Sequence, residues 1–499
     1  MSASESRRYR FGPLDRAGWI LGLHATQCVL LTGGLIAGGL VLRLTGSLLP
    51  GSLPVLAALV LAFARWETRP LHEWITPLAG WWSLRRRGLD HWGADILNLN
   101  RADVPELPPF LAGLRFLEIP VRTRPARASG VGVVVDPTGH VFSATLRARG
   151  REFALLEPAE QARILDAWGA ALAGFCRERG PVTRISWSEW AAPASLEAHL
   201  AFVREHHHDA PVGESLAAYL DVVADAGPLT TSHEVLVTLS VDRRHVQRPR
   251  ASDPLEATIQ TLLEELRLFT VRLQQAGVTV DEPLSPADLA MVLRLRADPS
   301  CAPRLYQRTR TLSEDARLVA PQNATPLAVH AHWRQVRADA ALHRCYWVAE
   351  WPRLQVPADW LATLLLHPGG IRTFSLIAEP VAPSRSRRAV DRDATRLASD
   401  EDQRARRGFR IRAAHRRAET EVLAREQELV SGYAELTYAG FLTITAFDPD
   451  TLETQAAEWQ QVAAQAGLEL RPLHGQHDLA LATALPLGHI PAPRRSLLT

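Results

Sequence analysis

Two uncharged stretches near the N-terminus decide the fold: residues 25–42 read ATQCVLLTGGLIAGGLVL, and residues 48–64 read LLPGSLPVLAALVLAFA. At a rise of about 1.5 Å per residue, a helix over the first stretch is about 27 Å long, close to the thickness of a hydrocarbon core. Pro50 and Pro54 lie in the first turns of the second stretch, where proline is best tolerated. We therefore expect a two-helix transmembrane hairpin over residues 25–64.

Basic residues flank both stretches and set the expected orientation. Arginines precede the first helix, and others follow the second helix as far as residue 87. Since positively charged flanks stay in the cytoplasm, both termini should lie inside, with Arg43 in a short outer link and residues 1–24 as a cytoplasmic segment. The expected location is the cell (inner) membrane. The first helix also carries glycines at the small-xxx-small spacing that lets helices approach closely: Gly33, Gly34, Gly38 and Gly39.

Aromatic and basic residues follow the hairpin directly. WITPLAGWW at residues 74–82 runs into three consecutive arginines after two intervening residues. Indole rings prefer the headgroup level of a bilayer, and arginine favours the anionic inner leaflet. We therefore expect residues 70–87 to lie along the cytoplasmic surface, within a linker over residues 65–110. The residues expected at this interface are Trp74, Trp81, Trp82, Arg85, Arg86 and Arg87. The alternative is an ordinary amphipathic core helix with a solvated charged end.

Two other interpretations of the apolar stretches are weaker. A signal peptide is disfavoured because 18 residues is a long apolar region, and the following RLTGS has no A-x-A cleavage pattern. Buried core helices of a soluble protein are disfavoured by the asymmetry of the flanking charges and by the nearby tryptophans.

Composition excludes several classes of function. The 499 residues include 56 basic and 54 acidic side chains, so a general nucleic-acid-binding protein is not expected. All 56 basic residues are arginine, which excludes a lysine-containing P-loop and Schiff-base catalysis. The cysteines form no CxxC pair, so neither a disulfide framework nor a cysteine metal site is expected. They are Cys28, Cys176, Cys301 and Cys345.

The rest of the chain predicts an α+β cytoplasmic body with antiparallel sheets. Stretches of β-branched and aromatic residues alternate with amphipathic helical patterns. Extended segments are expected at 115–122, 131–135, 140–148, 151–156, 182–190, 233–242, 343–354, 371–381, 434–448 and 468–474. Helices are expected at 157–179, 194–206, 214–225, 254–277 and 451–467. We divide the body into a first domain (111–300), an irregular connection (301–342) and a second domain (343–499). No internal repeat of fixed period is visible.

No catalytic, cofactor-binding or metal-binding residue is predicted. The run Glu205-His206-His207-His208-Asp209 is adjacent in sequence, and adjacent side chains cannot all face one ion. Four other residues could in principle converge, but no pattern orients them: His330, His332, His343 and Cys345. The sequence has no GxSxG motif, and Ser375 lies within an expected strand. The glycine-rich TGGLIAGG lies inside the apolar stretch, so it cannot bind phosphate.

A long stretch of mixed charge covers residues 384–431. The pattern is typical of a solvated helix, or a helix pair, with ion pairs four residues apart. The functional alternative is a docking surface for an acidic partner, whereas the nearby acidic residues disfavour nucleic acid. The arginines expected on this surface are Arg385, Arg387, Arg388, Arg404, Arg406, Arg407, Arg416 and Arg417.

Several strings spread over the chain resemble a family of actinobacterial two-span membrane proteins. These proteins come from loci that also encode conjugation-type ATPases. The strings are YRFGPL (9–14), FALLEPAEQ (153–161), YWVAEWPR (346–353), EPVAPSRSRRAV (379–390) and HGQHDLALATALPLG (474–488). They are not functional motifs, so the resemblance assigns no catalytic residue.

The layout is also similar to a small two-span subunit of type IV secretion systems fused to the N-terminal domain of their large secretion ATPase. In that family a leucine-rich, proline–glycine segment precedes the P-loop domain, and LPLG at residues 485–488 occupies that place. No P-loop follows, so the resemblance implies that a separate chain hydrolyses ATP.

We therefore expect a non-enzymatic, oligomeric component of a conjugative type IV-like secretion system. Its expected partners are the lipid bilayer, the separate secretion ATPase and other membrane subunits of the complex. Two alternatives remain open. One is a core membrane component of a type VII secretion system, and the other is a membrane-bound enzyme of unfamiliar type.

Overall fold

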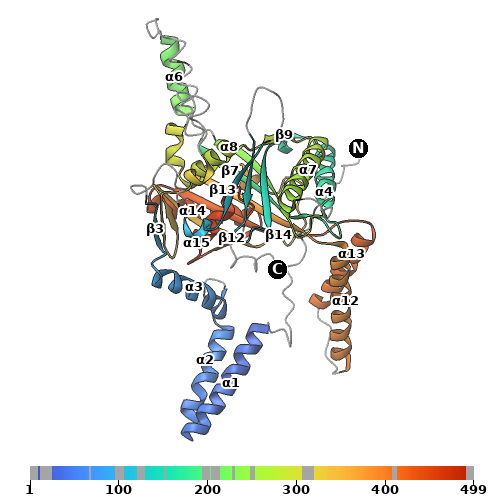
Figure 1. Cartoon of the computed structure of the whole chain (residues 1–499). Helices are drawn as coiled ribbons and strands as arrows, with labels where there is room; N and C mark the ends of the chain where they lie inside the picture. Colours follow the sequence, from blue (N-terminus) through green and yellow to red (C-terminus); the bar gives the residue numbers. More distant parts are fainter. Residues whose placement is uncertain are drawn as a thin grey trace.

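The computed structural model places an apolar helix pair on one side of an α/β body (Figure 1). The pair consists of α1 (Ala25–Thr45) and α2 (Leu48–Phe63), and α3 (Ile75–Arg86) lies between it and the body. Arg43 belongs to the last turn of α1 and not to the link as expected, because the helix continues three residues past the uncharged stretch. The structure describes residues 9, 11, 25–66, 69–95, 106–120, 130–150, 153–193, 203, 214–226, 231–247, 253–305, 320–406 and 413–489.

One large antiparallel sheet forms the body. In the described ranges it has 13 strands, and its main path runs β3-β10-β11-β12-β14-β13-β7-β8-β6-β5-β4. Strands β9 and β15 add to β6 and β12, respectively. The bounds are β3 (His91–Gly93), β4 (Arg115–Ile119), β5 (Val131–Val135), β6 (Val141–Arg149), β7 (Val182–Pro193), β8 (Thr231–Asp242), β9 (Thr279–Pro283), β10 (Ala328–Ala331), β11 (Val336–Ala338), β12 (Ala341–Glu350), β13 (Ile371–Pro380), β14 (Leu436–Ala446) and β15 (Glu469–Pro472). A separate ladder pairs β1 (Arg65–Trp66) with β2 (Arg69–Pro70).

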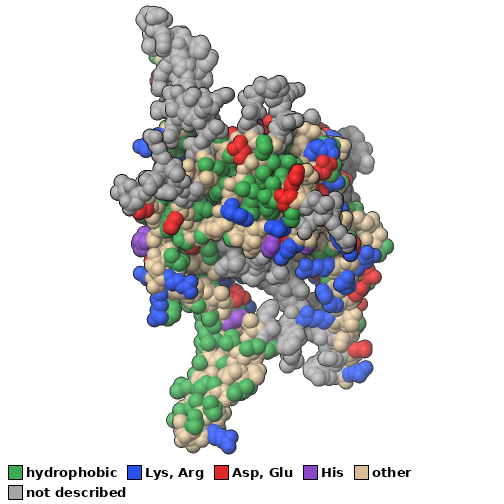
Figure 2. Space-filling view, in the orientation of Figure 1, with side chains coloured by type: hydrophobic (Ala, Val, Ile, Leu, Met, Phe, Trp, Pro, Cys, Tyr) green, Lys and Arg blue, Asp and Glu red, His purple; other side chains and the backbone are tan. Residues whose placement is uncertain are grey.

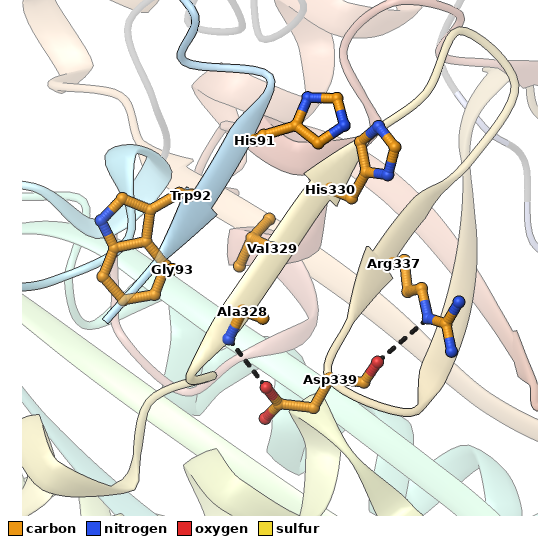
Figure 3. A pocket seen from close by; sticks show the side chains of 8 residues that line it. All are labelled: His91, Trp92, Gly93, Ala328, Val329, His330, Arg337 and Asp339. Atoms are coloured by element: carbon orange, nitrogen blue, oxygen red, sulfur yellow. Dashed lines mark hydrogen bonds between the residues drawn. The ribbon is translucent and has the colours of Figure 1, made fainter. Parts of the chain in front are cut away.

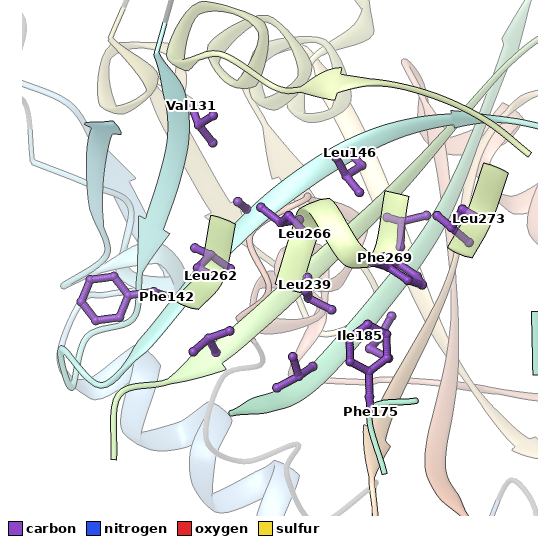
Figure 4. Packing of buried hydrophobic residues seen from close by; sticks show 14 of the residues in the cluster. Val131, Phe142, Leu146, Phe175, Ile185, Leu239, Leu262, Leu266, Phe269 and Leu273 are labelled. Carbon is purple, nitrogen blue, oxygen red and sulfur yellow. The ribbon is translucent and has the colours of Figure 1, made fainter. Parts of the chain in front are cut away.

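Two helices cover one face of the first half of the sheet, α4 (Pro158–Ala173) and α7 (Pro254–Gln275). Apolar residues recur every three or four positions along α7, so one stripe of the helix faces the strands. Leu262, Phe269 and Leu273 lie fully buried in this stripe. Figure 4 shows them packed against β6 and β8, whose alternate side chains point to the same face.

The second half of the sheet has an equivalent cover. Helix α14 (Pro449–Gln465) and the short α11 (Ala362–Leu365) pack over β12, β13 and β14. Trp459 of α14 is fully buried in this contact. Asp448 starts α14 by accepting a hydrogen bond from the Thr451 amide at 2.8 Å, which is the expected role of an N-cap carboxylate.

The opposite face is covered by α8 (Pro286–Ala297), by α15 (His477–Leu481) and by the residues that follow α15 as far as Gly488. Ser285 and Asp288 form a reciprocal capping box that fixes the start of α8. Thr145 and two buried arginines donate hydrogen bonds to backbone carbonyls of the C-terminal segment. These bonds join Thr145 to Pro486 (3.2 Å), Arg184 to Gly488 (2.8 Å) and Arg296 to Ala484 (2.9 Å).

The two halves of the sheet repeat one order of elements. In each half a hairpin leads through a helix to a strand, then to an insertion, a second strand, a helix, a short strand and a final helix. The correspondences are β5–β6 with β11–β12, α4 with α11, β7 with β13, β8 with β14, α7 with α14, β9 with β15, and α8 with α15. The strand order is mirrored about the β7–β13 pair, which is antiparallel. An approximate two-fold relationship therefore runs through the centre of the sheet.

The insertions of the two halves differ, which explains why no repeat of fixed period is visible in the sequence. The first includes α6 (Glu214–Ala226), and the second consists of α12 (Pro383–Arg406) and α13 (Ala413–Val430). Each insertion starts and ends at paired residues: Pro193 with Thr231, and Pro380 with Leu436. Figure 1 shows α12 and α13 extending to the same side of the body as α1 and α2, and α6 extending to the opposite side.

The predicted domains 111–300 and 343–499 lie close to the two halves of the body, but one sheet runs through both halves. Strand β7 from the first pairs with β13 from the second, and Trp187 on β7 contacts the cores of both halves. The connection at 301–342, expected to be irregular, contains β10 and β11. These strands have only four and three residues, too few for their alternation to be visible in the sequence.

The expected α+β class with antiparallel sheets is confirmed, and most predicted elements appear within a few residues of their expected bounds. The segment 151–156 is an exception, because residues 153–155 form a 3₁₀ turn and not a strand. The helix expected at 157–179 ends at Ala173, just before Gly174. The helix expected at 194–206 lies almost entirely outside the described residues.

Candidate membrane anchor and docking surface

Helices α1 and α2 turn most of their apolar side chains outward. Leu35, Ile36 and Leu44 on α1 and Leu49 and Leu53 on α2 are between 63% and 81% exposed. Figure 2 shows this apolar surface covering the helix pair. So large an apolar surface marks a contact with lipid or protein, and it argues against core helices of a soluble protein.

The two helices differ in their ability to span a bilayer. Residues Thr26–Thr45 are long and apolar enough to cross a membrane, and only 6% of their most apolar stretch is buried. Helix α2 has 16 residues. Its length of about 24 Å falls short of the roughly 30 Å of a hydrocarbon core. One candidate span is therefore present among the described residues, and the second remains a prediction.

Close packing of the pair depends on two of the four glycines. A Cβ atom on Gly34 would lie 2.4 Å from the Ala58 Cβ, and one on Gly38 would lie 2.7 Å from the Gly51 carbonyl oxygen. Gly33 points to open space, as does Gly39. The contact face of α1 is thus the Gly34/Gly38 stripe, which lets the backbones approach.

An aromatic cluster joins the helix pair to the body. Trp74 is only 3% exposed, and its ring lies 5.2 Å from Trp66, 6.2 Å from Trp333 and 5.7 Å from His474 (between centroids). Trp81 is half-buried and meets Trp333 edge-on at 5.9 Å. Trp74 was expected at the headgroup level, but it is buried because Trp333 and His474 from the second half of the body pack over it.

Trp82, Arg85, Arg86 and Arg87 remain exposed, as membrane contact would require. The Arg86 guanidinium lies over the Trp82 ring, 3.4 Å from its centroid, in cation–π geometry. Their contact with lipid remains a prediction.

The segment before α1 also contacts the body. Tyr9 pairs with Val356 through two backbone hydrogen bonds of 2.9 Å. Phe11 lies against Trp351 and Trp360, at centroid distances of 5.3 and 5.0 Å. The chain therefore contacts the same body on both sides of the helix pair.

The mixed-charge stretch forms a helix pair, as one of its two interpretations predicted. The side chains of Arg385, Arg387, Arg388, Arg406, Arg416 and Arg417 are exposed. Arg404 belongs to α12 but its side chain is not described, and Arg407 lies outside the described residues. Ion pairs four residues apart occur on both helices, at 3.9 Å between Arg406 and Asp402 and at 3.4 Å between Arg417 and Glu421.

Polar contacts fix the base of this helix pair on the body. The Ser384 amide and hydroxyl each donate a 2.7 Å hydrogen bond to the Glu178 carboxylate at the start of α12. These bonds, together with the charges of Arg387 and Arg388, lower the pKa of Glu178. Arg425 on α13 pairs with Asp393 on α12 at 3.3 Å and also contacts Glu435. The base is therefore held, while the far end of the pair projects from the body.

The sequence considered four residues as a possible cluster, and the structure separates His343 and Cys345 from the adjacent His330 and His332. His343 is buried between the Thr445 hydroxyl (2.9 Å) and the Ala297 carbonyl (2.8 Å). Burial lowers the pKa of His343 to about 4. Cys345 is buried as well, and its amide donates to His477 at 3.1 Å. His330 and His332 lie elsewhere, on and beside β10, where their neighbour is His91, which sequence reasoning missed.

The structure describes only one of the other two sequence candidates. Ser375 is 1% exposed in the middle of β13, opposite Ser188, as its place in a predicted strand suggested. The run Glu205–Asp209 lies outside the described residues.

Comparisons with known proteins assign no family to the chain. No protein-family model matches it, and no curated protein matches it either. The family resemblance carried by the strings quoted above stays a prediction.

Proposed function

We propose that this chain is a non-enzymatic, membrane-anchored component of a conjugative, type IV-like secretion complex that holds a separate secretion ATPase at the cytoplasmic face. The observation that carries the proposal is the apolar helix pair whose flanking segments both contact one α/β body. Phe11 lies against Trp351 before the pair, and Trp74 packs against Trp333 after it. The family resemblance supplies the type of complex.

The contacts on both sides of the pair favour a two-span hairpin with both termini cytoplasmic. If α1 crosses the bilayer, α2 must return the chain to the body that Phe11 already contacts. The arginines on both flanks agree with this orientation. Helix α2 is shorter than α1, and a short span is accommodated by local thinning of the bilayer at modest cost.

The body then serves as a platform for the motor. The α12–α13 pair is fixed at its base, projects toward the anchor side and presents Arg406, Arg416 and Arg417 to solvent. An acidic surface on the ATPase is its complementary partner, because exposed arginines form bidentate pairs with carboxylates. Other membrane subunits would contact the outward apolar face of α1 and α2.

A pull-down tests the proposal. The full chain, tagged at its C-terminus, is extracted in mild detergent from membranes that contain the whole gene locus, and co-purifying proteins are identified by mass spectrometry. A conjugation-type ATPase at near-stoichiometric amounts supports the proposal. A type VII membrane core would redirect it to that system, and purification of the chain alone would overturn both.

A charge-removal variant localises the docking surface. R416Q/R417Q should reduce ATPase recovery several-fold, since exposed interfacial charges steer association. The matched control is R163Q/R267Q, which removes exposed, ion-paired arginines from α4 and α7. Equal recovery of the ATPase by both variants would exclude the α12–α13 pair as the docking surface.

A further inference from the structure

Three histidines gather at the edge of the sheet, where the chain enters the body after the anchor. β3 pairs with β10, and His91 lies directly opposite His330 in their register. His332 follows two residues later, so it points to the same face. Trp92 and Val329 alternate with these residues and pack into the core on the other face. Figure 3 shows the His91 and His330 rings side by side. Both residues line a hollow of about 360 Å³.

A carboxylate completes the group. The Asp90 Oδ2 atom lies 3.2 Å from His91 Nδ1, and one ligand atom each from Asp90, His91 and His330 lie within 4.8 Å of one another. The ring centroids of His330 and His332 are 3.8 Å apart. Asp90 is 8% exposed, and its backbone carbonyl accepts a 2.8 Å hydrogen bond from the Ala331 amide. The carboxylate is therefore held by the same edge of the sheet that carries the histidines.

We propose that Asp90, His91 and His330 bind a divalent transition-metal ion, with His332 as the adjacent fourth ligand. Imidazole nitrogens and a carboxylate oxygen are the ligand set of zinc, and cobalt and nickel accept the same donors. The ion joins β3, which follows the anchor segment, to β10, which belongs to the second half of the body. It acts as a clamp between the membrane anchor and the body.

Asp90, His91 and His330 need only a small closure to hold the ion, because their ligand atoms already lie within 4.8 Å of one another. Ligand atoms around tetrahedral zinc are about 3.3 Å apart when each metal–ligand bond is about 2.0–2.1 Å. The His91 side chain is 64% exposed, so it is free to rotate toward the other ligands. Arg85, whose Nε atom lies 3.8 Å from Asp90 Oδ2, would be displaced from the carboxylate.

A bound metal ion would strengthen the attachment of β3 to β10, because β3 is short. It contributes three residue pairs to the sheet, from His91–His330 to Gly93–Ala328. A strand of this length has few ladder hydrogen bonds, and a metal ion bound by both strands adds to its attachment at the edge of the sheet. The inference does not depend on the proposed secretion role, since any force on the membrane anchor would act on the β3–β10 pair.

Zinc binding to the purified full chain tests the inference. All versions carry a non-histidine affinity tag. His206, His207 and His208 are replaced by alanine, so that no bound metal can be attributed to this run of imidazoles. After treatment with chelator, the chain in detergent is dialysed against Zn²⁺, and bound zinc is measured by mass spectrometry. The expected result is one ion per chain, with the visible spectrum of tetrahedral Co²⁺ when cobalt replaces zinc.

Three variants assign the ligands. H91A/H330A should lose at least about tenfold in zinc affinity, and D90N should show a smaller loss. The matched control is H367A, which removes a histidine bonded to a carboxylate, Glu458, at another place on the body. Unchanged zinc affinity in H91A/H330A, or no binding once residues 206–208 are replaced, would overturn the proposal.

Hydrogen exchange tests the clamp itself. In the chain that keeps His91 and His330, zinc should slow amide exchange several-fold in peptides covering residues 87–95 and 328–332. In the H91A/H330A variant, zinc should not change the exchange of these peptides. Slowing of equal size in both would mean that zinc acts elsewhere.

Discussion

Acidification should destabilise the body through His343. Its side chain is fully buried, with the Ala297 carbonyl accepting from one ring nitrogen and the Thr445 hydroxyl donating to the other. Desolvation lowers its pKa from 6.5 to about 4, because hydrogen bonding to Ala297 and the charge of Asp298 only partly oppose the effect of burial. The folded protein therefore holds the neutral ring, whereas the unfolded chain takes up a proton below pH 6.5.

The magnitude follows from linkage. The stability associated with the neutral ring is complete above pH 6.5 and is lost as the pH falls from 6.5 toward 4. At pH 5 the loss is about 2 kcal/mol, because each pH step below the unfolded pKa costs about 1.4 kcal/mol until the folded group titrates. Urea unfolding of the full chain in detergent, followed by tryptophan fluorescence at pH 7.5 and 5.0, measures it.

A comparison of variants isolates this residue from the other titrating groups. H343Q removes the titration, so its free energy of unfolding should fall by about 2 kcal/mol less than that of the wild type between the two pH values. H245Q, which removes an exposed histidine, is the control for loss of one imidazole. Equal pH dependence of H343Q and wild type would refute the reasoning.

Two glycine substitutions give further tests, each with an internal control. G34L should destabilise the α1–α2 pair by about 1–3 kcal/mol in detergent unfolding because its Cβ meets the facing helix at 2.4 Å, whereas G33L, in open space, should not. G488A should cost about 1–3 kcal/mol more than G432A in urea unfolding. Both positions have positive φ, but only a Cβ on Gly488 meets Ser143, at 2.3 Å. Equal effects within either pair would show that the contact is relieved by local movement.

The local sequence pattern was sufficient to predict a helix or strand where that element is long and its apolar or charged residues recur at a regular spacing. Helix α7 and strand β13 lie where the spacing of their apolar residues placed them. The charge pattern of residues 384–431 correctly indicated helix, without deciding between one helix and a pair. These features depend on neighbours three or four residues apart, or on alternation along one strand, so they are readable without the fold.

Features that depend on distant pairing were not predictable. Nothing near Trp187 indicates that β7 pairs with a strand almost two hundred residues later, so the body was divided into two domains. Trp74 belonged to a convincing interfacial pattern, yet Trp333 and His474 cover it. His91 and His330 become neighbours only through the β3–β10 register, and the only local signal was the spacing of His330 and His332.

Each of the two insertions starts and ends at residues that are paired in the sheet, so its length can change without altering the strands. Pro193 and Thr231 are neighbours across the sheet, as are Pro380 and Leu436, so the length of either insertion leaves the strand register untouched. Adding residues to such a loop costs little, because closure entropy grows only slowly with length. Either insertion, α6 on one side of the body or α12–α13 on the other, can therefore change in length while the sheet stays the same. A new partner can be acquired in this way without rebuilding the core.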